Sequence, residues 1–312
     1  MYNKIEEPLN GSYPGLPMQS MKNTKIPSCN NSQLDEVNQI IRASAVEPLD
    51  ASTILRTALD HHLLQNGSLS RAQLTLSAAK ALGLSLDNQI HLAAAVECLH
   101  NASLIQDDLQ DNDTSRRGQA SIWSKFGSNI AINLTDLMIA TSFVLLSRVD
   151  SEGCLPRLLV CMQKAIAHTL QGQSRDLYNE SAARAVKTSL AVAESKSGPL
   201  FALCLELPLI TANQFSSLDR AQQAGKFFGA GYQVLDDIND ASSDQATHSS
   251  ANVVIALSNA FSAKDAHNEA QTVAHHYFAR ARQLAESLPN NCAALLLEYC
   301  EILNQQLKES ES

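Results

Sequence analysis

The chain has 312 residues, of which 45% are hydrophobic and 18% charged, and its formal net charge is −9. This composition is typical of a globular protein with a large core, and its acidity excludes the extended basic surface on which nucleic-acid binding depends. Seven cysteines without a CxxC pair indicate free thiols, so we expect a cytoplasmic protein without structural zinc. The sequence shows no signal-peptide pattern and no apolar run near membrane-spanning length, which predicts neither secretion nor a transmembrane segment.

The predicted elements are all helices, because apolar residues recur at three- and four-residue spacing and Gly and Pro are few. Residues 1–33 are rich in Asn, Ser, Pro, Gly and Lys and lack this periodicity, which predicts a disordered extension. From residue 34 to residue 312 we expect a single-domain, all-α helical bundle. The predicted helices are 34–46, 51–65, 70–82, 86–112, 119–126, 128–149, 155–179, 182–206, 211–240, 251–263, 265–287 and 290–308.

Two predicted helices end in the same acidic pattern, DDxxD, at Asp107 to Asp111 and at Asp236 to Asp240. Residues four apart on a helix share a face, so each motif presents a fork of carboxylates. Their mutual repulsion destabilises a helix unless a cation compensates it, and Mg²⁺ prefers carboxylate oxygens and shares its other positions with water and phosphate. A solvated acidic face is the alternative. Both motifs follow apolar, core-like sequence, which favours the metal site.

Two arginines and one histidine accompany the first motif. Arg116 and Arg117 follow it directly, and guanidinium groups bind diphosphate oxygens in bidentate fashion, which is typical of a metal-bridged diphosphate site. Surface ion pairs with the neighbouring aspartates are the alternative. His100 shares one helical stripe with Asp107 and Asp111, so we expect it to face the same space as the carboxylates. A lone buried histidine is otherwise more often a core residue.

This combination, with RRG after the first motif and GYQVL before the second, resembles the trans-isoprenyl diphosphate synthases over residues from about 50 to 260. The resemblance implies an all-α bundle around a central cavity, with two or three Mg²⁺ ions, or Mn²⁺, held between the motifs. It also implies a prenyltransferase that joins an allylic prenyl diphosphate to isopentenyl diphosphate. Departure of the allylic diphosphate leaves a carbocation, the double bond of isopentenyl diphosphate attacks it, and a proton is lost. The family is usually homodimeric.

The resemblance also implies roles for individual positions. The metal ligands are Asp107, Asp108, Asp111, Asp236, Asp237 and Asp240. Arg116 contacts the allylic diphosphate, and the residues at isopentenyl diphosphate are Arg71, His100 and Arg117. Lys196 and Ser197, in AESKSGPL, match a Lys-Thr pair beside the reacting carbons, so Lys196 joins the aspartates as a catalytic residue. Polar residues that line the same cavity are Gln173, Asp176 and Gln233.

Two lysines of the family pattern are absent from this chain. Where the family has Gly-Lys-x-x-Arg-Pro, this chain has NGSLSRAQ, with Ser68 at the lysine position. The loop after the second motif, in residues 241–252, also lacks a lysine, and His248 is the candidate substitute. Three interpretations stay open: a synthase with an altered site, a terpene synthase that ionises a prenyl diphosphate without adding isopentenyl diphosphate, or a subunit of a heteromeric synthase. The retained motifs favour the first.

Ala102 and Ser103 lie one helical turn before Asp107, where side-chain size controls product length in the family. Small residues here imply a product of twenty carbons or somewhat longer. The next residues that could close the cavity and stop chain growth are Leu99 and then Val96, because one helical turn advances about 5.4 Å, close to one isoprene unit. The alternative is that the two residues are small only to let helices pack closely, and that another helix closes the cavity.

Overall fold

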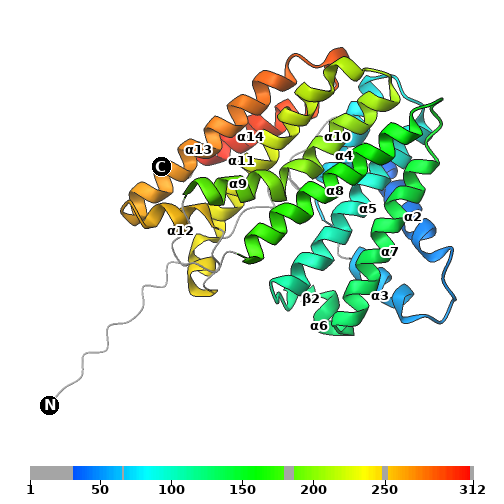
Figure 1. The fold of residues 1–312 in the computed structure, drawn as a ribbon, viewed down its shortest axis with the longest axis horizontal. Coiled ribbons are helices and arrows are strands. Elements are labelled where there is room, and N and C mark those ends of the chain that lie inside the picture. The colour runs from blue at the N-terminus through cyan, green and yellow to red at the C-terminus, as the bar shows by residue number, and fades with distance from the viewer. Residues whose placement is uncertain (1–30, 65–66, 179–185, 248–251, 310–312) are drawn as a thin grey trace.

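The computed structural model describes residues 31–64, 67–178, 186–247 and 252–309, which fold as a bundle of α-helices (Figure 1). The helices are α2 (Asn31–Val46), α3 (Ile54–Leu63), α4 (Ser70–Ala81), α5 (Leu86–Gln110), α6 (Ile122–Phe126), α7 (Ser128–Ser147), α8 (Leu155–Tyr178), α9 (Val186–Lys196), α10 (Gly198–Thr211), α11 (Leu218–Thr247), α12 (Val253–Ser258), α13 (Ala263–Ala285) and α14 (Ala294–Glu309). The short elements are β1 (Ser115–Arg116), β2 (Gln119–Ala120), η1 (Phe215–Ser217) and η2 (Pro289–Asn291). The expected all-α class is confirmed.

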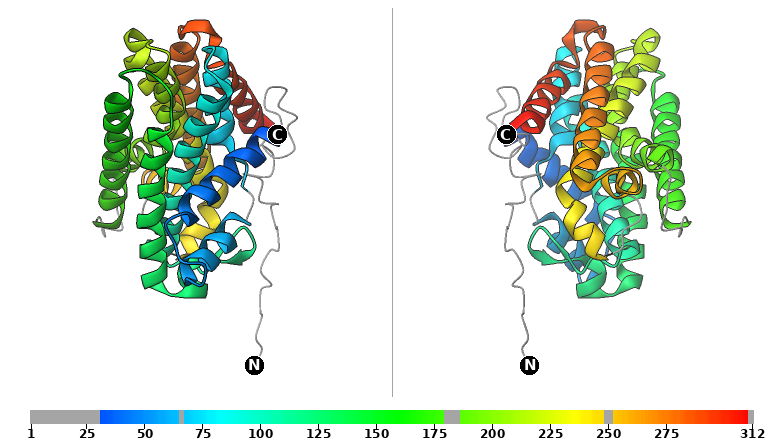
Figure 2. Two further views of the ribbon diagram at one scale, coloured as in Figure 1. Left: turned by 90° about the vertical axis from the view of Figure 1, so that its right-hand side faces the viewer. Right: turned by 90° about the vertical axis from the view of Figure 1, so that its left-hand side faces the viewer.

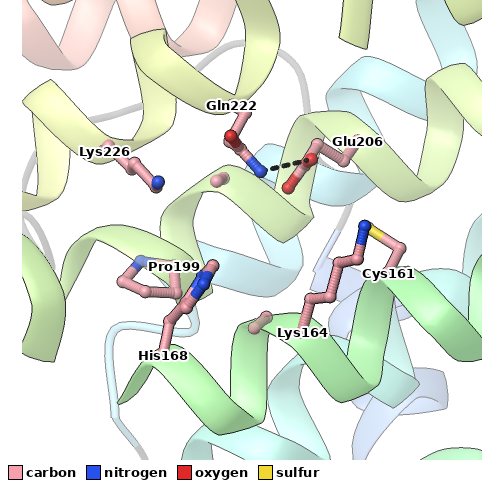
Figure 3. Close-up of a pocket in the computed structure, with 9 residues that line it drawn as sticks. Cys161, Lys164, His168, Pro199, Glu206, Gln222 and Lys226 are labelled. Carbon is pink, nitrogen blue, oxygen red and sulfur yellow. Dashed lines mark hydrogen bonds between the residues drawn. The ribbon is translucent and has the colours of Figure 1, made fainter. Parts of the chain in front are cut away.

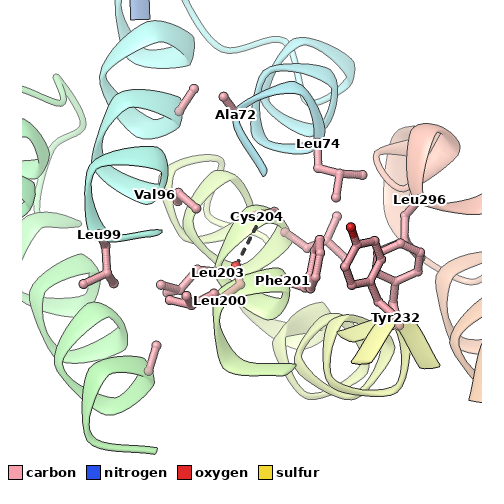
Figure 4. Close-up of a cluster of buried hydrophobic side chains, with 14 of the residues drawn as sticks. Ala72, Leu74, Val96, Leu99, Leu200, Phe201, Leu203, Cys204, Tyr232 and Leu296 are labelled. Atoms are coloured by element: carbon pink, nitrogen blue, oxygen red, sulfur yellow. Dashed lines mark hydrogen bonds between the residues drawn. The ribbon is translucent and has the colours of Figure 1, made fainter. Parts of the chain in front are cut away.

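The central helix α10 is apolar on all sides, and all of its residues are buried. A helix that is hydrophobic all round belongs in the middle of a bundle, and α10 packs against α4, α5, α8 and α11. Its Phe201 ring contacts the rings of Phe228 and Tyr232 on α11, with centroids 4.9 and 5.6 Å apart. Figure 4 shows this part of the core, where side chains from α4, α5, α10, α11 and α14 meet. In Figure 2, α8 and α14 lie on opposite sides of the bundle.

The predicted helix over 182–206 is in fact two helices, α9 and α10, which are separated at Ser197. Pro199 lies in the first turn of α10, and it has no N–H to donate to the carbonyl four residues earlier, so a continuous helix would be interrupted here. Residues 179–185 lie outside the described residues. The break places Lys196 at the end of one helix and Ser197 at the start of the next.

The predicted helix over 211–240 begins later and ends later than expected, because α11 runs from Leu218 to Thr247. The second aspartate motif therefore lies within a helix and not at its end. Two glycines let α11 approach α10: a Cβ at Gly225 would overlap the backbone of Ala202, and one at Gly229 would overlap the backbone of Gly198. This close packing fixes the second motif relative to the start of α10.

At the other end of the chain, α2 begins at Asn31, before the predicted boundary at residue 34. Residues 1–30 of the predicted extension lie outside the described residues, and so does His248. The expectation of disorder for residues 1–33 is therefore wrong for residues 31–33 and stays a prediction for the rest.

The segment after the first motif forms a β-hairpin, so the helix predicted over 119–126 begins three residues later, at Ile122 of α6. Ser115 pairs with Ala120 and Arg116 with Gln119, and the two residues between them have positive φ, 51° at Arg117 and 79° at Gly118. A two-residue turn with positive φ at both central residues matches the twist of the hairpin strands, and glycine is preferred in such turns. The hairpin turns the chain back, so that Arg116 and Arg117 lie beside α5.

One described helix, α7, is long and apolar enough to cross a membrane, and 44% of its apolar window is buried inside the bundle. Ser, Thr and Asn are spaced among its apolar residues, which is why no apolar run near membrane-spanning length was expected from the sequence. Buried core helices have the same length and composition, so this finding is weak evidence for a membrane span. In the bundle, α7 packs against α5, α6 and α2.

The cysteines of the described part form no disulfide, as predicted, and their thiols are free. Most of them are buried, and burial raises the pKa of Cys98. They therefore behave as small hydrophobic side chains of the core.

Candidate functional site

The first aspartate motif divides between two sides of α5. Asp107 lies in the last turn of the helix and Asp111 follows it as the C-cap, with its N–H donating to the Asp107 carbonyl at 2.8 Å. Asp108 points elsewhere: its side chain is almost completely buried and accepts a hydrogen bond from Arg116 Nε at 2.6 Å. Burial raises the pKa of Asp108 to about 6, and the charge of Arg116 opposes that rise. Arg116 is therefore paired with Asp108, and not with Asp111 or Asp113 as the surface alternative supposed.

A lysine lies beside the other two carboxylates of the motif. Lys196 Nζ is 4.0 Å from Asp111 Oδ2 and 3.6 Å from Asp176 Oδ2. Burial would lower the pKa of Lys196, but the charges of Asp107, Asp111 and Asp176 outweigh it and the pKa is raised. Lys196 thus carries a fixed positive charge at neutral pH. The structure brings this group together from α5, α8 and α9.

Burial also raises the pKa values of Asp107 and Asp111, although Lys196 opposes the rise. A carboxylate removed from water is stable as an anion only beside a counter-charge, and one ammonium group is shared here among several carboxylates. The donor set is made of oxygen ligands only, which suits a hard divalent cation such as Mg²⁺. Among the described residues, however, no three Asp, Glu, His or Cys side chains converge at metal-binding positions. A cation here would take its remaining ligands from water and diphosphate oxygens, as Mg²⁺ commonly does.

The second motif on α11 presents Asp236, and the pKa of this carboxyl is raised well above its usual value. Burial is the main cause, and the charges of Asp237 and Asp240 add to it, whereas Arg71 opposes it. Arg71 belongs to α4. The charge of Arg71, which the family resemblance assigns to isopentenyl diphosphate, therefore acts on the second motif.

Asp237 differs from its neighbour, because protein groups occupy both of its carboxylate oxygens. Oδ1 accepts from Gln233 Nε2 at 3.1 Å and Oδ2 accepts from the backbone N–H of Val253 at 2.8 Å. The Asp237 carbonyl accepts from the side chain of Asn252 at 2.7 Å. Asp237 thus fixes the start of α12 against α11, and a metal would have to compete with these bonds for it.

Gln233 continues this series of hydrogen bonds to the start of α10. The hydroxyl of Ser197 donates to Gln233 Oε1 at 2.8 Å, while Gln233 donates to Asp237. Ser197, Gln233 and Asp237, all predicted as site residues, therefore form one series that links α10, α11 and α12. Gln173 on α8 is different: it is buried, and neither of its amide atoms has a hydrogen-bond partner in the described part of the chain. Such a group is available to a ligand.

Arg71 and His100 are in direct contact, as their predicted shared role requires. Arg71 Nη1 donates to His100 Nε2 at 3.1 Å, and the guanidinium lies over the ring of Phe201, 4.2 Å from its centroid. Burial and the charge of Arg71 hold the pKa of His100 well below its usual value. The neutral ring accepts at Nε2 and so carries its proton on Nδ1. Nδ1 of His100 and Nε of Arg71 are buried and lack a partner within the described residues, so two donors face the site without an acceptor.

Arg117 lies at the tip of the hairpin, and its guanidinium packs against the backbone of Gly67. A Cβ at position 67 would overlap the guanidinium of Arg117, so the glycine leaves the space that this side chain fills. Burial lowers the pKa of Arg117, and the largest opposing attraction comes from Glu97 on α5. Sequence reasoning missed both Gly67 and Glu97, since a glycine in a turn and a single acid in an apolar helix carry no motif.

His62 is also buried. Its Nε2 donates to Asn101 Oδ1 at 2.9 Å, and burial lowers its pKa to about 4. The pairing with Asn101 joins α3 to α5 directly behind the arginines. Only the fold brings these two residues together.

The residues predicted to control product length lie on the stretch of α5 before the motif. Ala102 is buried, and the hydroxyl of Ser103 donates to the His100 carbonyl at 2.8 Å. The two deeper candidates, Leu99 and Val96, are buried in the apolar cluster that includes residues of α10 (Figure 4). Their order along α5 is the predicted one, and their role stays a prediction.

A small pocket of about 30 Å³ lies between α8, α10 and α11, away from the aspartates (Figure 3). Glu206 lines it and accepts a hydrogen bond from Gln222 at 3.3 Å. Burial raises the pKa of Glu206 to about 7, and Lys226 opposes the rise. The space suffices for one or two water molecules, and no predicted site residue lines it.

Comparison with known families and proteins gives a consistent result. The model of the polyprenyl synthetase family matches residues 52–251. The geranylgeranyl pyrophosphate synthase of Geoglobus acetivorans is 30% identical over 191 residues, which are 60% of this chain and 60% of that protein. The octaprenyl diphosphate synthase of Haemophilus influenzae is 28% identical over 214 residues, 68% of this chain and 63% of that protein. The matched regions thus span less than two thirds of either relative.

Solved structures share the fold over most of the chain. The geranylgeranyl pyrophosphate synthetase of Geoglobus acetivorans superposes with a TM-score of 0.79 at 24% identity, covering 88% of this chain and 98% of that one. The decaprenyl diphosphate synthase of Rhodobacter capsulatus gives 0.73 at 20% identity, covering 89% and 97%. At these identities the likeness establishes the architecture, and it confirms the predicted bundle of isoprenoid synthase type.

Proposed function

Because the chain belongs to the polyprenyl synthetase family, we propose that it is a prenyltransferase that joins an allylic prenyl diphosphate to isopentenyl diphosphate. The observation that carries the proposal is the position of Arg71 between the two halves of the site. It donates to His100 on α5 at 3.1 Å, and its charge acts on Asp236 on α11. Two groups therefore adjoin: carboxylates with Lys196, which would bind a diphosphate through metal ions, and arginines with His100, which would bind a diphosphate directly.

In this proposal Asp107, Asp111 and Asp236 hold Mg²⁺, with Asp108 and Asp240 in support, while Asp237 chiefly orders α12. The bound cations supply positive charge that stabilises the departing allylic diphosphate. Lys196 adds a fixed ammonium group beside the same carboxylates. Arg116, held by Asp108, reaches the allylic diphosphate from the hairpin.

The second diphosphate is assigned to the donors that have no acceptor. Arg71 Nε and His100 Nδ1 are buried and without a partner among the described residues, and an unsatisfied buried donor costs about 1 to 3 kcal/mol. A diphosphate oxygen at this place removes that cost and positions isopentenyl diphosphate for attack. Arg117 adds charge at the same place. Asp176 lies beside Lys196, and the amide of Gln173 on the same helix, which has no partner among the described residues, is assigned to the same side of the cavity.

We propose a product of twenty carbons or somewhat longer. The proposal is supported by the small side chains of Ala102 and Ser103 ahead of the first motif, and Leu99 is the next residue that could close the cavity. The names of the relatives do not narrow the choice, since they extend from geranylgeranyl to octaprenyl diphosphate synthases.

The test is incubation of the purified chain with Mg²⁺ and farnesyl diphosphate, with and without labelled isopentenyl diphosphate. Label in a longer diphosphate supports the proposal. A hydrocarbon or alcohol formed from farnesyl diphosphate alone would instead indicate a terpene synthase, the alternative motivated by Ser68. No product in either incubation would indicate the third alternative, a subunit that requires a partner.

The proposal includes a homodimer in the cytoplasm. Several apolar side chains of α7 and α8 are exposed, among them Ile132, Val144, Val160 and Leu170, and they are the candidate partner surface, since protein interfaces are often built from exposed apolar groups. Light scattering of the purified chain measures the oligomeric state, and a monomer at micromolar concentration would contradict the dimer.

A further inference from the structure

Glu97 is a buried acid on α5 for which the reaction has no direct use. Only 3% of the residue is exposed, and its Oε2 accepts a hydrogen bond from the backbone N–H of Ala72 at 3.2 Å. Ala72 lies in the first turn of α4, where N–H groups have no partner inside the helix. The N-cap of α4 is Leu69, which offers no side-chain oxygen. Glu97 therefore caps α4 from a neighbouring helix, and Arg71 stands on the turn that it caps.

Glu97, Gly67 and Arg117 line one small pocket, which places Glu97 beside an arginine of the proposed isopentenyl diphosphate site. Burial raises the pKa of Glu97, and Arg71 and Arg117 both oppose that rise. In return, Glu97 exerts the largest attraction on Arg117. Arg116 is already held by Asp108. The hairpin thus presents two adjacent arginines to two different carboxylates of α5.

Two further contacts hold Glu97 and Arg117 in place. Asn101 Nδ2 donates to the Glu97 carbonyl at 2.8 Å, and Asn101 Oδ1 accepts from His62 Nε2 at 2.9 Å, which ties this turn of α5 to α3. On the other side, the bare backbone of Gly67 lies against the Arg117 guanidinium. Glu97 and Gly67 therefore both contribute to the direction of the Arg117 side chain.

We propose that Glu97 is a positioning residue, whose carboxylate holds the guanidinium group of Arg117 toward the diphosphate that is bound at Arg71 and His100. A carboxylate repels a diphosphate, so Glu97 does not touch the substrate and acts through Arg117. Without it, Arg117 turns toward solvent, while Arg71 keeps its place over Phe201. The identity of the diphosphate rests on the proposed function, but the arrangement of the arginines does not.

The experiment compares binding of inorganic diphosphate and of isopentenyl diphosphate, measured by titration calorimetry without Mg²⁺, in Glu97→Gln and in the wild-type chain. We expect the dissociation constants of Glu97→Gln to rise about tenfold or more, since an Arg–diphosphate contact of about 1.4 kcal/mol corresponds to tenfold. Glu206→Gln is the matched control, because Glu206 is another buried acid that lies away from the arginines. It should bind both ligands within twofold of wild type.

Two more variants separate positioning from a general effect on folding. Gly67→Ala displaces the Arg117 guanidinium and leaves Glu97 unchanged, and it should weaken binding to a similar degree. In an Arg117→Ala background, adding Glu97→Gln should cost less than threefold, because the two residues act through one contact. Steady-state kinetics should show a raised KM for isopentenyl diphosphate and an unchanged KM for the allylic substrate, a split that a loss of stability would not produce.

Binding by Glu97→Gln as tight as wild type, or tighter, would overturn the inference, since it would mean that Glu97 only repels the anion. The inference would also be overturned if the double variant weakened binding by the product of the two single-variant effects. If the wild-type chain binds diphosphate in a Glu97-dependent way but makes no longer prenyl product, the proposed function fails and this inference stands. If it makes the product and Glu97→Gln changes nothing, the inference alone fails. A wild-type chain that binds no diphosphate overturns both.

Discussion

Replacement of Lys196 by Gln removes the ammonium group that lies 4.0 Å from Asp111 and 3.6 Å from Asp176. Unit charges at about 4 Å interact with about 4 kcal/mol where the effective dielectric constant is about 20. The side chain of Asp111 is 41% exposed, so solvent screens part of this energy. Contacts of a charged donor commonly contribute about 1.5 to 3 kcal/mol. We therefore expect Lys196→Gln to lose about 2 kcal/mol of transition-state stabilisation, which is about 30-fold in kcat/KM.

The assay is incorporation of labelled isopentenyl diphosphate into prenyl diphosphate at saturating Mg²⁺. Lys196→Arg keeps the charge and should retain more activity than Lys196→Gln. Lys226→Gln is the control, since Lys226 lines the pocket around Glu206 and should leave kcat/KM unchanged. The reasoning is refuted if Lys196→Gln keeps wild-type kcat/KM, or if Lys226→Gln loses as much.

Three further predictions concern the first motif. Asp108→Asn leaves Arg116 without its buried partner and should lower the free energy of unfolding by about 3 kcal/mol, a cost typical of breaking a buried pair, measured by urea denaturation; an unchanged midpoint would contradict it. Ala102→Phe should shorten the product, and chromatography that shows an unchanged chain-length distribution would remove this role. Protonation of a carboxylate prevents metal binding, and the pKa of Asp108 is raised to about 6 while those of Asp107 and Asp111 are also raised. The Mg²⁺ concentration for half-maximal activity should therefore increase as pH falls through about 6, and a requirement independent of pH would refute this.

The parts of the site that were predictable from sequence are those that lie at fixed spacing along one helix. Asp107 and Asp111 share a helical face with His100, so their common direction follows from the period of the helix. The apolar stretches before both motifs predicted that the carboxylates would lie close to the core, and the raised pKa values agree with that. The family resemblance assigned Arg71 and His100 to one diphosphate, and their direct contact is seen only in the structure.

The parts that were not predictable depend on contacts between distant segments. Asp237 has the same motif position as Asp108, yet one binds the start of α12 and the other binds Arg116. Spacing cannot distinguish them, because the partners come from a loop and a hairpin. Glu97 lies in an apolar run, and its role depends on the first turn of α4 and on the tip of the hairpin. The helix predicted over 119–126 begins only at Ile122, because the turn at Arg117 and Gly118 places Gln119 and Ala120 in a hairpin strand.

The central claim is that departure of the allylic diphosphate is coupled to addition of isopentenyl diphosphate. It is tested most directly by measuring, in one reaction with Mg²⁺ and farnesyl diphosphate, both the inorganic diphosphate released and the labelled isopentenyl diphosphate incorporated. We predict one diphosphate released for each label incorporated, with all label in a diphosphate of twenty carbons or more. Release of diphosphate without incorporation, or no release at all, would contradict the claim.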